Sequence, residues 1–309
     1  MSIKPLLIVL ALILPAAAHA LTDASQVPVL YYHSASVGPE CSPDDTDVLA
    51  IARDARILRE EGYTIVPLMQ IVRWYLGELP GSALPDKAVA ITLDDGHDRD
   101  WLSGIPSHGM RPDYPCPGLP SAREVAVQNG IHMTTFVIGS PTARHIINPD
   151  YGSDNWWLSA EHHPLFTVGN HSIDHEHRRI TTQVWDPEIG ALLPAAGHAD
   201  NAWDGQMRPE RWTNYESADL AVRASAEYIA KMTDVWPELL AYPMGWTSDY
   251  MRYVYMPGYQ HEHRTIAAFC TEAGAHDLML TKNSDRWCLP RMGHKALWRT
   301  GDELRALLP

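Results

Sequence analysis

The stretch AVAITLDDG, Ala88 to Gly96, decides the fold and raises the question of function. Its apolar and β-branched residues predict a buried strand, because strands covered on both faces read as continuous hydrophobic runs. Two adjacent carboxylates, Asp94 and Asp95, follow, and each disfavours ionisation of the other. A solvated turn would explain them, since Asp and Gly are common turn residues. A cation bound by one carboxylate, with the other left for chemistry, would explain them as well.

Strand-like and helix-like segments alternate along the rest of the 309-residue chain. Such alternation predicts an α/β fold with a parallel sheet, whose active site lies at the carboxyl ends of the strands. Long polar loops interrupt it at His97–Pro120 and Pro141–Pro164, and ordered loops of that length are often functional. Besides Ala88–Leu93, strands are predicted at Val27–His33, Tyr63–Leu68, His132–Gly139, Phe166–Ser172, Leu239–Gly245, Thr265–Cys270 and Cys288–Met292. Helices are predicted at Asp47–Glu61, Met69–Leu76, Ser121–Asn129, Tyr215–Met232 and from the Thr300–Glu303 capping box onward.

A second motif, GNHSIDHEH, follows the strand at Phe166. If His171 and His175 begin a helical turn, their imidazoles share one face and can bind one cation. With 16 histidines in the chain, about one such pair is expected by chance, so the spacing alone is weak. A carboxylate and two histidines at strand ends are more specific, because three protein ligands that leave room for water are typical of catalytic zinc sites. The neighbouring aspartate can then act as a general base.

Together TLDDG, HSIDH, AYPMG and LPRMG resemble, in that order, the polysaccharide deacetylases of carbohydrate esterase family 4, the NodB-homology type. The resemblance covers most of the chain and implies a distorted (β/α)7-type barrel in a single domain. It implies that Asp94 is the catalytic base. It also implies that Asp95, His171 and His175 hold Zn²⁺ or another divalent transition metal.

Two departures from the family pattern bear on the groove. Leu93 replaces the usual Phe, and AYPMG replaces the usual Arg-x-Pro-Tyr motif. Tyr242 and Met244 are therefore assigned to the groove, where the Met244 backbone N–H can serve as an oxyanion donor without any particular side chain. Arg291 in LPRMG is the candidate for positioning the base.

Two histidines compete for the role of general acid. VPVLYYH matches a branch of the family in which this histidine lies on an early strand, so His33 comes first and His294 second. A buried histidine bonded to backbone is the equally weighted alternative for His33. Three more are predicted to be surface residues rather than ligands: His177, His261 and His263. Three tryptophans are expected to border the site: Trp156, Trp157 and Trp246.

The amino terminus and the cysteines indicate an exported protein. Residues 1–20 combine a lysine, a short apolar run and an Ala-His-Ala end, as in a cleaved signal peptide, so 21–309 would form the catalytic domain without a stable membrane span. Four cysteines without a C-x-x-C pair predict disulfides in the periplasm or outside the cell. Of the three possible pairings, Cys270–Cys288 with Cys41–Cys116 is favoured.

The sequence thus predicts a periplasmic or secreted metal-dependent deacetylase acting on N-acetyl or O-acetyl groups of a carbohydrate polymer, such as an acetylated polysaccharide or peptidoglycan. The net charge of −14 argues against nucleic acid as a partner. Two alternatives stay open. One is a carbohydrate-binding relative without turnover, and the other is a metallohydrolase of a small non-sugar amide, whose pocket the two long loops would close.

Overall fold

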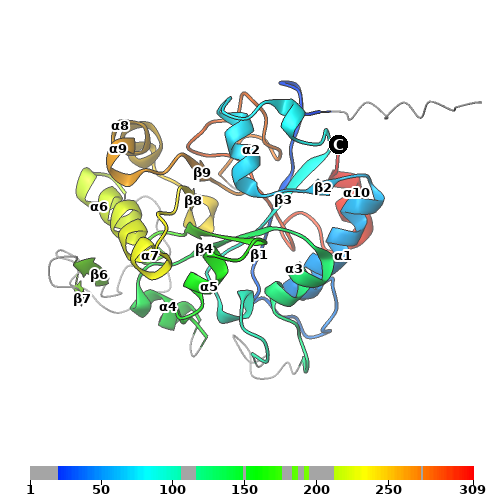
Figure 1. The fold of residues 1–309 in the computed structure, drawn as a ribbon, viewed down its shortest axis with the longest axis horizontal. Helices are drawn as coiled ribbons and strands as arrows, with labels where there is room; N and C mark the ends of the chain where they lie inside the picture. The colour runs from blue at the N-terminus through cyan, green and yellow to red at the C-terminus, as the bar shows by residue number, and fades with distance from the viewer. Residues whose placement is uncertain are drawn as a thin grey trace, which may run out of the picture.

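Eight parallel strands form one curled sheet in the computed structural model, which describes residues 20–105, 116–148, 151–175, 183–186, 191–194, 212–272 and 274–309 (Figure 1). Their order is β10-β1-β3-β4-β5-β8-β9, with β2 paired to the start of β3. The strands are β1 Val29–Tyr32, β2 Thr64–Ile65, β3 Ala88–Leu93, β4 Met133–Val137, β5 Phe166–Asn170, β8 Leu239–Ala241, β9 Ala267–Phe269 and β10 Met292–Gly293. A separate antiparallel hairpin consists of β6 Gln183–Asp186 and β7 Ala191–Pro194.

The two ends of the sheet are connected through the segment that precedes β10. Phe269 of β9 forms a parallel bridge with Leu289, and β10 pairs with Leu30 and Tyr31 of β1. The sheet therefore curls back toward its own first strand, with helices outside it. The predicted fold class, a distorted (β/α) barrel, is confirmed.

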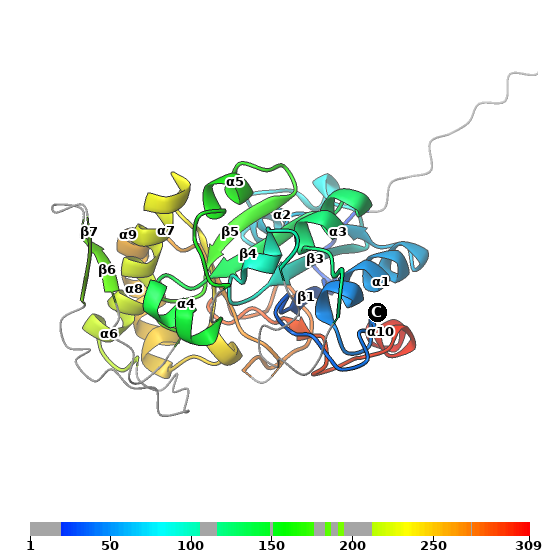
Figure 2. The same ribbon diagram turned by 90° about the horizontal axis from the view of Figure 1, so that it is seen from below.

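Helices cover the outside of the sheet (Figures 1 and 2). Helix α1 buries Val48, Ile51, Ala55 and Leu58, which recur at helical spacing, as the sequence predicts. The predicted capping box opens α10, and a second capping box, formed by Ser121 and Glu124, opens α3. The α-helices are α1 Asp47–Glu60, α2 Leu68–Tyr75, α3 Ala122–Asn129, α4 Pro141–Ile147, α5 Trp157–Glu161, α6 Tyr215–Asp219, α7 Ser225–Thr233, α8 Met256–Gly258, α9 Gln260–His263 and α10 Gly301–Leu307. Short 3₁₀ turns occur at Gly81–Ala83, Asp98–Asp100 and Pro243–Gly245, and π-helical turns at Leu220–Ala224 and Met251–Tyr255.

One prediction about the helices needs correction, and another holds with a local irregularity. The segment Pro141–Pro164, predicted to be a loop, contains α4 and α5. Both are short, and α4 starts at a Ser140 cap followed by Pro141, a signal that apolar periodicity does not detect. The predicted helix at Tyr215–Met232 is confirmed: α6, the π-helical turn and α7 follow one another without a break from Tyr215 to Thr233, with helical backbone angles at both junctions.

Glycine at position 169 is required by packing at the centre of the sheet. A Cβ atom there would lie 2.5 Å from the ring of Phe136 on neighbouring β4. The Phe136 ring fits because Gly169 has no side chain, and it then packs against Phe269, with ring centroids 6.1 Å apart. The FTVGN strand therefore carries its glycine for close packing.

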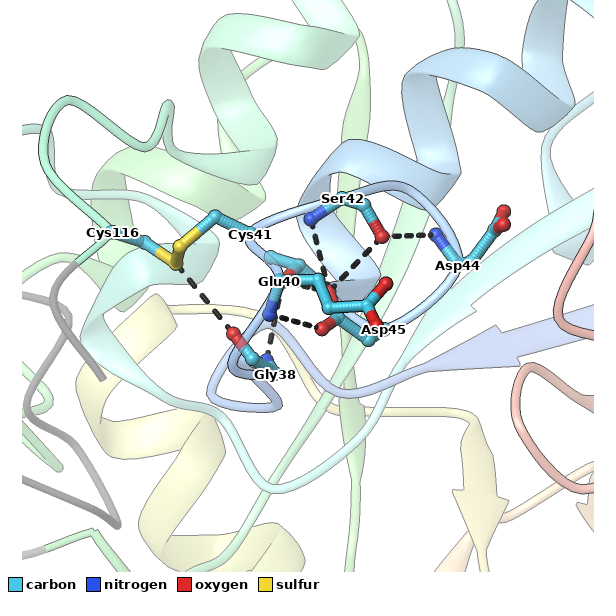
Figure 3. Close-up of a disulfide and its surroundings, with 8 residues drawn as sticks. Gly38, Glu40, Cys41, Ser42, Asp44, Asp45 and Cys116 are labelled. Atoms are coloured by element: carbon cyan, nitrogen blue, oxygen red, sulfur yellow. Dashed lines mark hydrogen bonds between the residues drawn. A yellow bond between two sulfur atoms is a disulfide. The ribbon is translucent and has the colours of Figure 1, made fainter. Parts of the chain in front are cut away.

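Both favoured disulfides are present. Cys41–Cys116 and Cys270–Cys288 have Cα–Cα distances of 5.5 and 4.9 Å. The first one fixes a loop that Asp45 organises from within, by accepting the backbone N–H groups of Glu40 and Ser42 at 2.7 and 2.9 Å (Figure 3). These bonds and a Ser42 hydroxyl hold the pKa of Asp45 below its usual value although burial raises it.

Among the residues that the structure describes, we find no helix with the length and apolar character needed to cross a membrane.

We expect replacement of either disulfide by two serines to lower the free energy of unfolding. The bonded cysteines are 75 and 18 residues apart, so chain entropy predicts losses of about 4 kcal/mol for Cys41–Cys116 and about 3 kcal/mol for Cys270–Cys288. Urea unfolding monitored by tryptophan fluorescence measures both. Midpoints identical to that of the wild type would contradict this expectation.

Candidate metal and catalytic site

The carboxyl ends of the parallel strands bring the sequence-predicted residues to one edge of the sheet. His33 follows β1, the Asp94–Asp95 pair follows β3, and His171 follows β5. The Pro243–Gly245 turn lies just beyond β8, and His294 just beyond β10. Parallel strands place these positions together although they lie far apart in sequence, and this edge holds the ligand sites of α/β folds.

Asp95, His171 and His175 are the one cluster of metal-ligand type found within the described residues. One ligand atom from each lies within 4.8 Å of the other two. The Nε2 atoms of His171 and His175 are 3.5 and 3.2 Å from Oδ1 of Asp95. The two imidazoles meet edge to face with centroids 5.0 Å apart. All three donors therefore converge on a common point.

The donor chemistry fits a divalent cation. His171 donates its Nδ1–H to the Ala241 carbonyl at 2.8 Å, so its Nε2 carries the lone pair and faces Asp95. Burial raises the pKa of Asp95, but the two histidines outweigh it, and the net pKa lies well below the usual value. An ionised carboxylate and a neutral imidazole are the forms that bind metal.

Left-handed backbone shapes the two ligand loops. Asp95 and Gly96 have φ of +73° and +65°, which turns the chain sharply after β3 and explains the glycine of the DDG motif. Ser172 and His175 have φ of +64° and +51°, so the HSIDH segment is an irregular loop. The helical turn expected from the i, i+4 spacing is wrong; the two imidazoles meet because the loop folds back, with the His175 N–H donating to Ser172 Oγ at 3.1 Å.

Asp94 forms a buried, bidentate ion pair with Arg291. The Nη1 and Nη2 atoms of Arg291 lie 2.6 and 2.8 Å from the two carboxylate oxygens, and Nη1 also donates to Thr92 Oγ1 at 3.2 Å. The guanidinium lies over the rings of Tyr31 and Phe136, at 5.0 and 5.3 Å from their centroids. This fork is geometrically specific, which a lysine would not reproduce.

The electrostatics keep Asp94 ionised. Burial raises its pKa, yet the Arg291 charge and the nearby imidazoles lower it more, so the net pKa lies below the usual 3.8. Asp94 is therefore an ionised carboxylate that is paired with Arg291 and is next in sequence to Asp95, a member of the candidate metal cluster.

The structure separates the two candidate acids. The side chain of His33 is 38% exposed, and its Nε2 lies 4.0 Å from Oδ2 of Asp95. The imidazole of His294 is fully buried; its Nδ1–H donates to Asp47 at 2.9 Å, and its ring packs against Tyr32 and Trp298. Only His33 of the two has an exposed ring beside the ligand cluster.

Of the two residues assigned to the groove, one is exposed and the other is buried. Met244 has φ of +58° and is 52% exposed, just beyond the strand whose Ala241 carbonyl holds His171. Tyr242 is fully buried and packs against Trp212, so the expectation that it lines an open groove is wrong. Its side chain faces the apolar cluster of α6 and the following helices because side chains alternate along a strand.

Tryptophans and further histidines also depart from expectation. Trp156 and Trp157 are buried anchors, and Trp156 donates its Nε1–H to Asp98 at 3.0 Å, whereas Trp246 is 50% exposed. His263 is buried rather than on the surface, with Nε2–H donating to the Met256 carbonyl at 3.1 Å, and burial lowers its pKa to about 4. The other two proposed surface histidines are His261, which is exposed, and His177, which lies outside the described residues.

Two buried carboxylates near the site were not predicted from the sequence. Asp47 bonds the His33 backbone N–H at 2.8 Å. Asp100 accepts hydrogen bonds from Ser34 and Thr135. Burial raises its pKa more than these two bonds lower it, to about 7. Asp47 looks like an ordinary helix-start aspartate and Asp100 like a loop residue, so no sequence signal distinguishes them.

Searches by sequence found no matching family model and no matching curated protein. Comparison with solved structures found similar folds across nearly the whole chain. A de-N-acetylase from Aggregatibacter actinomycetemcomitans is 16% identical, with a TM-score of 0.56 over 87% of this chain and 94% of its own. The Streptococcus pyogenes deacetylase PplD is 13% identical, with a TM-score of 0.57 over 92% and 98%. IcaB from Ammonifex degensii is 17% identical, with a TM-score of 0.55 over 89% and 97%.

The strand order, the helices outside the curled sheet and these similarities agree with the resemblance read from the motifs. The chain has the polysaccharide deacetylase fold.

Proposed function

We propose that this protein is a metal-dependent hydrolase that removes acetyl groups from a carbohydrate polymer. One observation carries the proposal: the Asp95, His171 and His175 ligand atoms converge next to an ionised Asp94 that Arg291 holds bidentately. The site lies at the carboxyl ends of the parallel strands, and two of the similar solved proteins are described as a de-N-acetylase and a deacetylase.

Asp95, His171 and His175 would hold the ion, with zinc the first choice for a set of two imidazoles and a carboxylate. When bound, such an ion makes water more acidic and polarises a carbonyl. Asp94 accepts the proton of the attacking water, and its pairing with Arg291 keeps it ionised and oriented. The exposed Met244 turn supplies a backbone N–H for the developing oxyanion.

His33 is the proposed general acid. As the bond between the acetyl carbon and the leaving nitrogen or oxygen breaks, the His33 imidazolium gives its proton to the leaving atom. His294 is unsuited to this task because its side chain is fully buried and bonded to Asp47. The products are acetate and a free amine or hydroxyl on the sugar.

We also propose that the protein works in the periplasm or outside the cell. The apolar segment 1–20, of which 1–19 lie outside the described residues, would be the secretory leader. Two disulfides support this location, since such bonds persist in oxidising compartments.

Metal binding gives the first test. Isothermal titration of the metal-free protein with Zn²⁺ should show one tight site, and Asp95→Ala or His171→Ala should abolish it, because each removes one of three ligands. His261→Ala is the matched control, since that imidazole is 76% exposed and lies outside the cluster, and it should bind as the wild type does. A folded wild type that binds no divalent transition metal would sink the proposal.

Acetate release gives the second test. We expect the zinc-loaded wild type to deacetylate N-acetylglucosamine oligomers, and Asp94→Asn to lower kcat by about 10²–10⁴ with zinc affinity retained, because only the base is lost. Enzymatic assay of acetate against polymer and small N-acetyl amides, at equal acetyl concentration, measures it. Acetate release from small non-sugar amides alone would favour the alternative function, a metallohydrolase of a small non-sugar amide.

The Asp94–Arg291 pair predicts a shift in pH dependence. Arg291→Lys keeps a positive charge but loses the fork, so burial raises the pKa of Asp94 with less opposition. Because the base must be ionised, the acid limb of kcat/KM should move to higher pH, with kcat about tenfold lower at its optimum. An unchanged acid limb in a folded Arg291→Lys variant would show that this pair does not control the base.

A further inference from the structure

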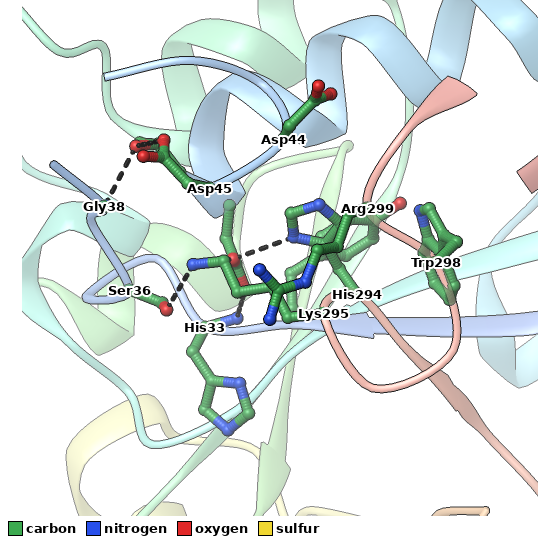
Figure 4. A network of polar contacts seen from close by, with 12 residues as sticks. His33, Ser36, Gly38, Asp44, Asp45, His294, Lys295, Trp298 and Arg299 are labelled. Carbon is green, nitrogen blue, oxygen red and sulfur yellow. Dashed lines mark hydrogen bonds and ion pairs between the residues drawn. The ribbon is translucent and has the colours of Figure 1, made fainter. Parts of the chain in front are cut away.

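A buried carboxylate, Asp47, holds the turn that carries His33. Asp47 is the first residue of α1 and is almost fully buried. Its Oδ2 accepts the backbone N–H of His33 at 2.8 Å. Its Oδ1 is 2.9 Å from Nδ1 of His294 and 2.9 Å from Nζ of Lys295 (Figure 4). Donors that follow β1 and β10 therefore meet on one carboxylate.

Lys295 closes the network around the turn. Its Nζ donates to Ser36 Oγ at 2.7 Å, and the Ser36 N–H donates to the His33 carbonyl at 2.8 Å. The Asp47 N–H donates to the Ser36 carbonyl at 3.0 Å. Lys295 has φ of +71°, a conformation that residues other than glycine adopt only when their surroundings impose it.

A second buried group holds the residue after His33. The Ser34 hydroxyl donates to Oδ1 of Asp100, whose Oδ2 accepts from Thr135 of β4 at 2.6 Å. Arg99 donates to the Ser34 carbonyl at 3.3 Å. The turn is thus tied to α1, to the segment after β10 and to β4, and its backbone has little freedom to move.

The His33 ring itself is held much less firmly. It points away from the Asp47 network (Figure 4). Among the residues that the structure describes, the ring meets Tyr31 edge to face, with centroids 5.8 Å apart, and its Nε2 lies 4.0 Å from Oδ2 of Asp95. The direction of this half-exposed ring therefore depends on the backbone that carries it.

We propose that Asp47, with His294 and Lys295 as its partners, is a positioning residue that fixes the His33 backbone and so aims its ring at the leaving group. This inference rests on the proposed role of His33 as the general acid. It also gives the buried His294 a function: with Lys295, it supplies the donors that keep the Asp47 carboxylate in place.

Geometry makes such positioning consequential. Proton donation requires the acid to reach the leaving atom at hydrogen-bond distance, and a misplacement of about 1 Å can cost about 10²-fold in rate. The need for an acid also depends on the leaving group. A sugar amine must be protonated to depart, whereas 4-nitrophenolate departs as an anion without help.

The test compares two acetyl substrates with the zinc-loaded protein, an N-acetylglucosamine oligomer and 4-nitrophenyl acetate. We expect Asp47→Asn to lower kcat on the amide by about 10–10² and to change kcat on the aryl ester less than about threefold. KM and zinc affinity by calorimetry should stay unchanged, because Asp47 touches neither the ligands nor the open side of the site. His33→Ala should show the same selective loss, only larger.

Asp54→Asn is the matched control. Asp54 lies on the same helix, is equally buried, and accepts from Tyr32 and Trp298 at 2.9 Å each without contacting His33. It should lower the melting temperature yet leave the amide-to-ester ratio unchanged. Lys295→Met, at a position whose side chain is partly exposed, provides a milder variant should Asp47→Asn not fold, and should lower the same ratio about three- to tenfold.

The outcomes distinguish a failure of the positioning role from a failure of the proposed function. Equal losses on amide and ester in Asp47→Asn or Lys295→Met, with an active wild type, would overturn the positioning role alone. So would an Asp54→Asn variant with the same selective loss. A wild type that hydrolyses neither substrate would overturn this inference together with the proposed function.

Discussion

The ion pair between Asp94 and Arg291 is the constraint on which the site depends. Both groups are buried, and a buried charge without its partner is strongly destabilising. Arg291 lies just before β10 and Asp94 just after β3, 197 residues apart in the sequence. The segment before β10 lies against β9, and β10 itself pairs with β1, so the closure of the sheet brings Arg291 to the carboxylate of the proposed base. Tyr31 of β1 and Phe136 of β4 each present a ring to the guanidinium.

Much of the fold and the outline of the site could be predicted because they depend on local patterns. The run Ala88–Leu93 is apolar except for the β-branched Thr92, so it was predictable as a buried strand, with the carboxylates after it at the edge that holds ligand sites in α/β folds. The capping boxes of α3 and α10 and the spacing in α1 are local in the same sense. Parallel pairing of β3, β4 and β5 then brings the candidate ligand residues to the same edge of the sheet.

The errors fall where tertiary contacts decide. Periodicity does not report the short helices α4 and α5, which are held by a cap and by buried tryptophans. In the loop from His171 to His175, Ser172 and His175 have left-handed backbone angles. Neither is a glycine, so the sequence gives no signal for this conformation. The choice between His33 and His294 likewise depends on burial, since both histidines stand next to a strand end and differ only in what surrounds them.

The Cys270–Cys288 bond has a consequence for how the protein matures. The Cys270 carbonyl accepts the Nε–H of Arg291 at 3.4 Å, and the Cys270 N–H donates to the Leu289 carbonyl at 2.9 Å. One cysteine thus supplies an acceptor to the arginine that pairs with Asp94, and the other lies three residues before that arginine. A newly synthesised chain contains all the residues of the candidate site, but this anchor becomes covalent only after the chain meets an oxidant. Formation of this disulfide would therefore also fix the segment that carries Arg291 of the candidate site.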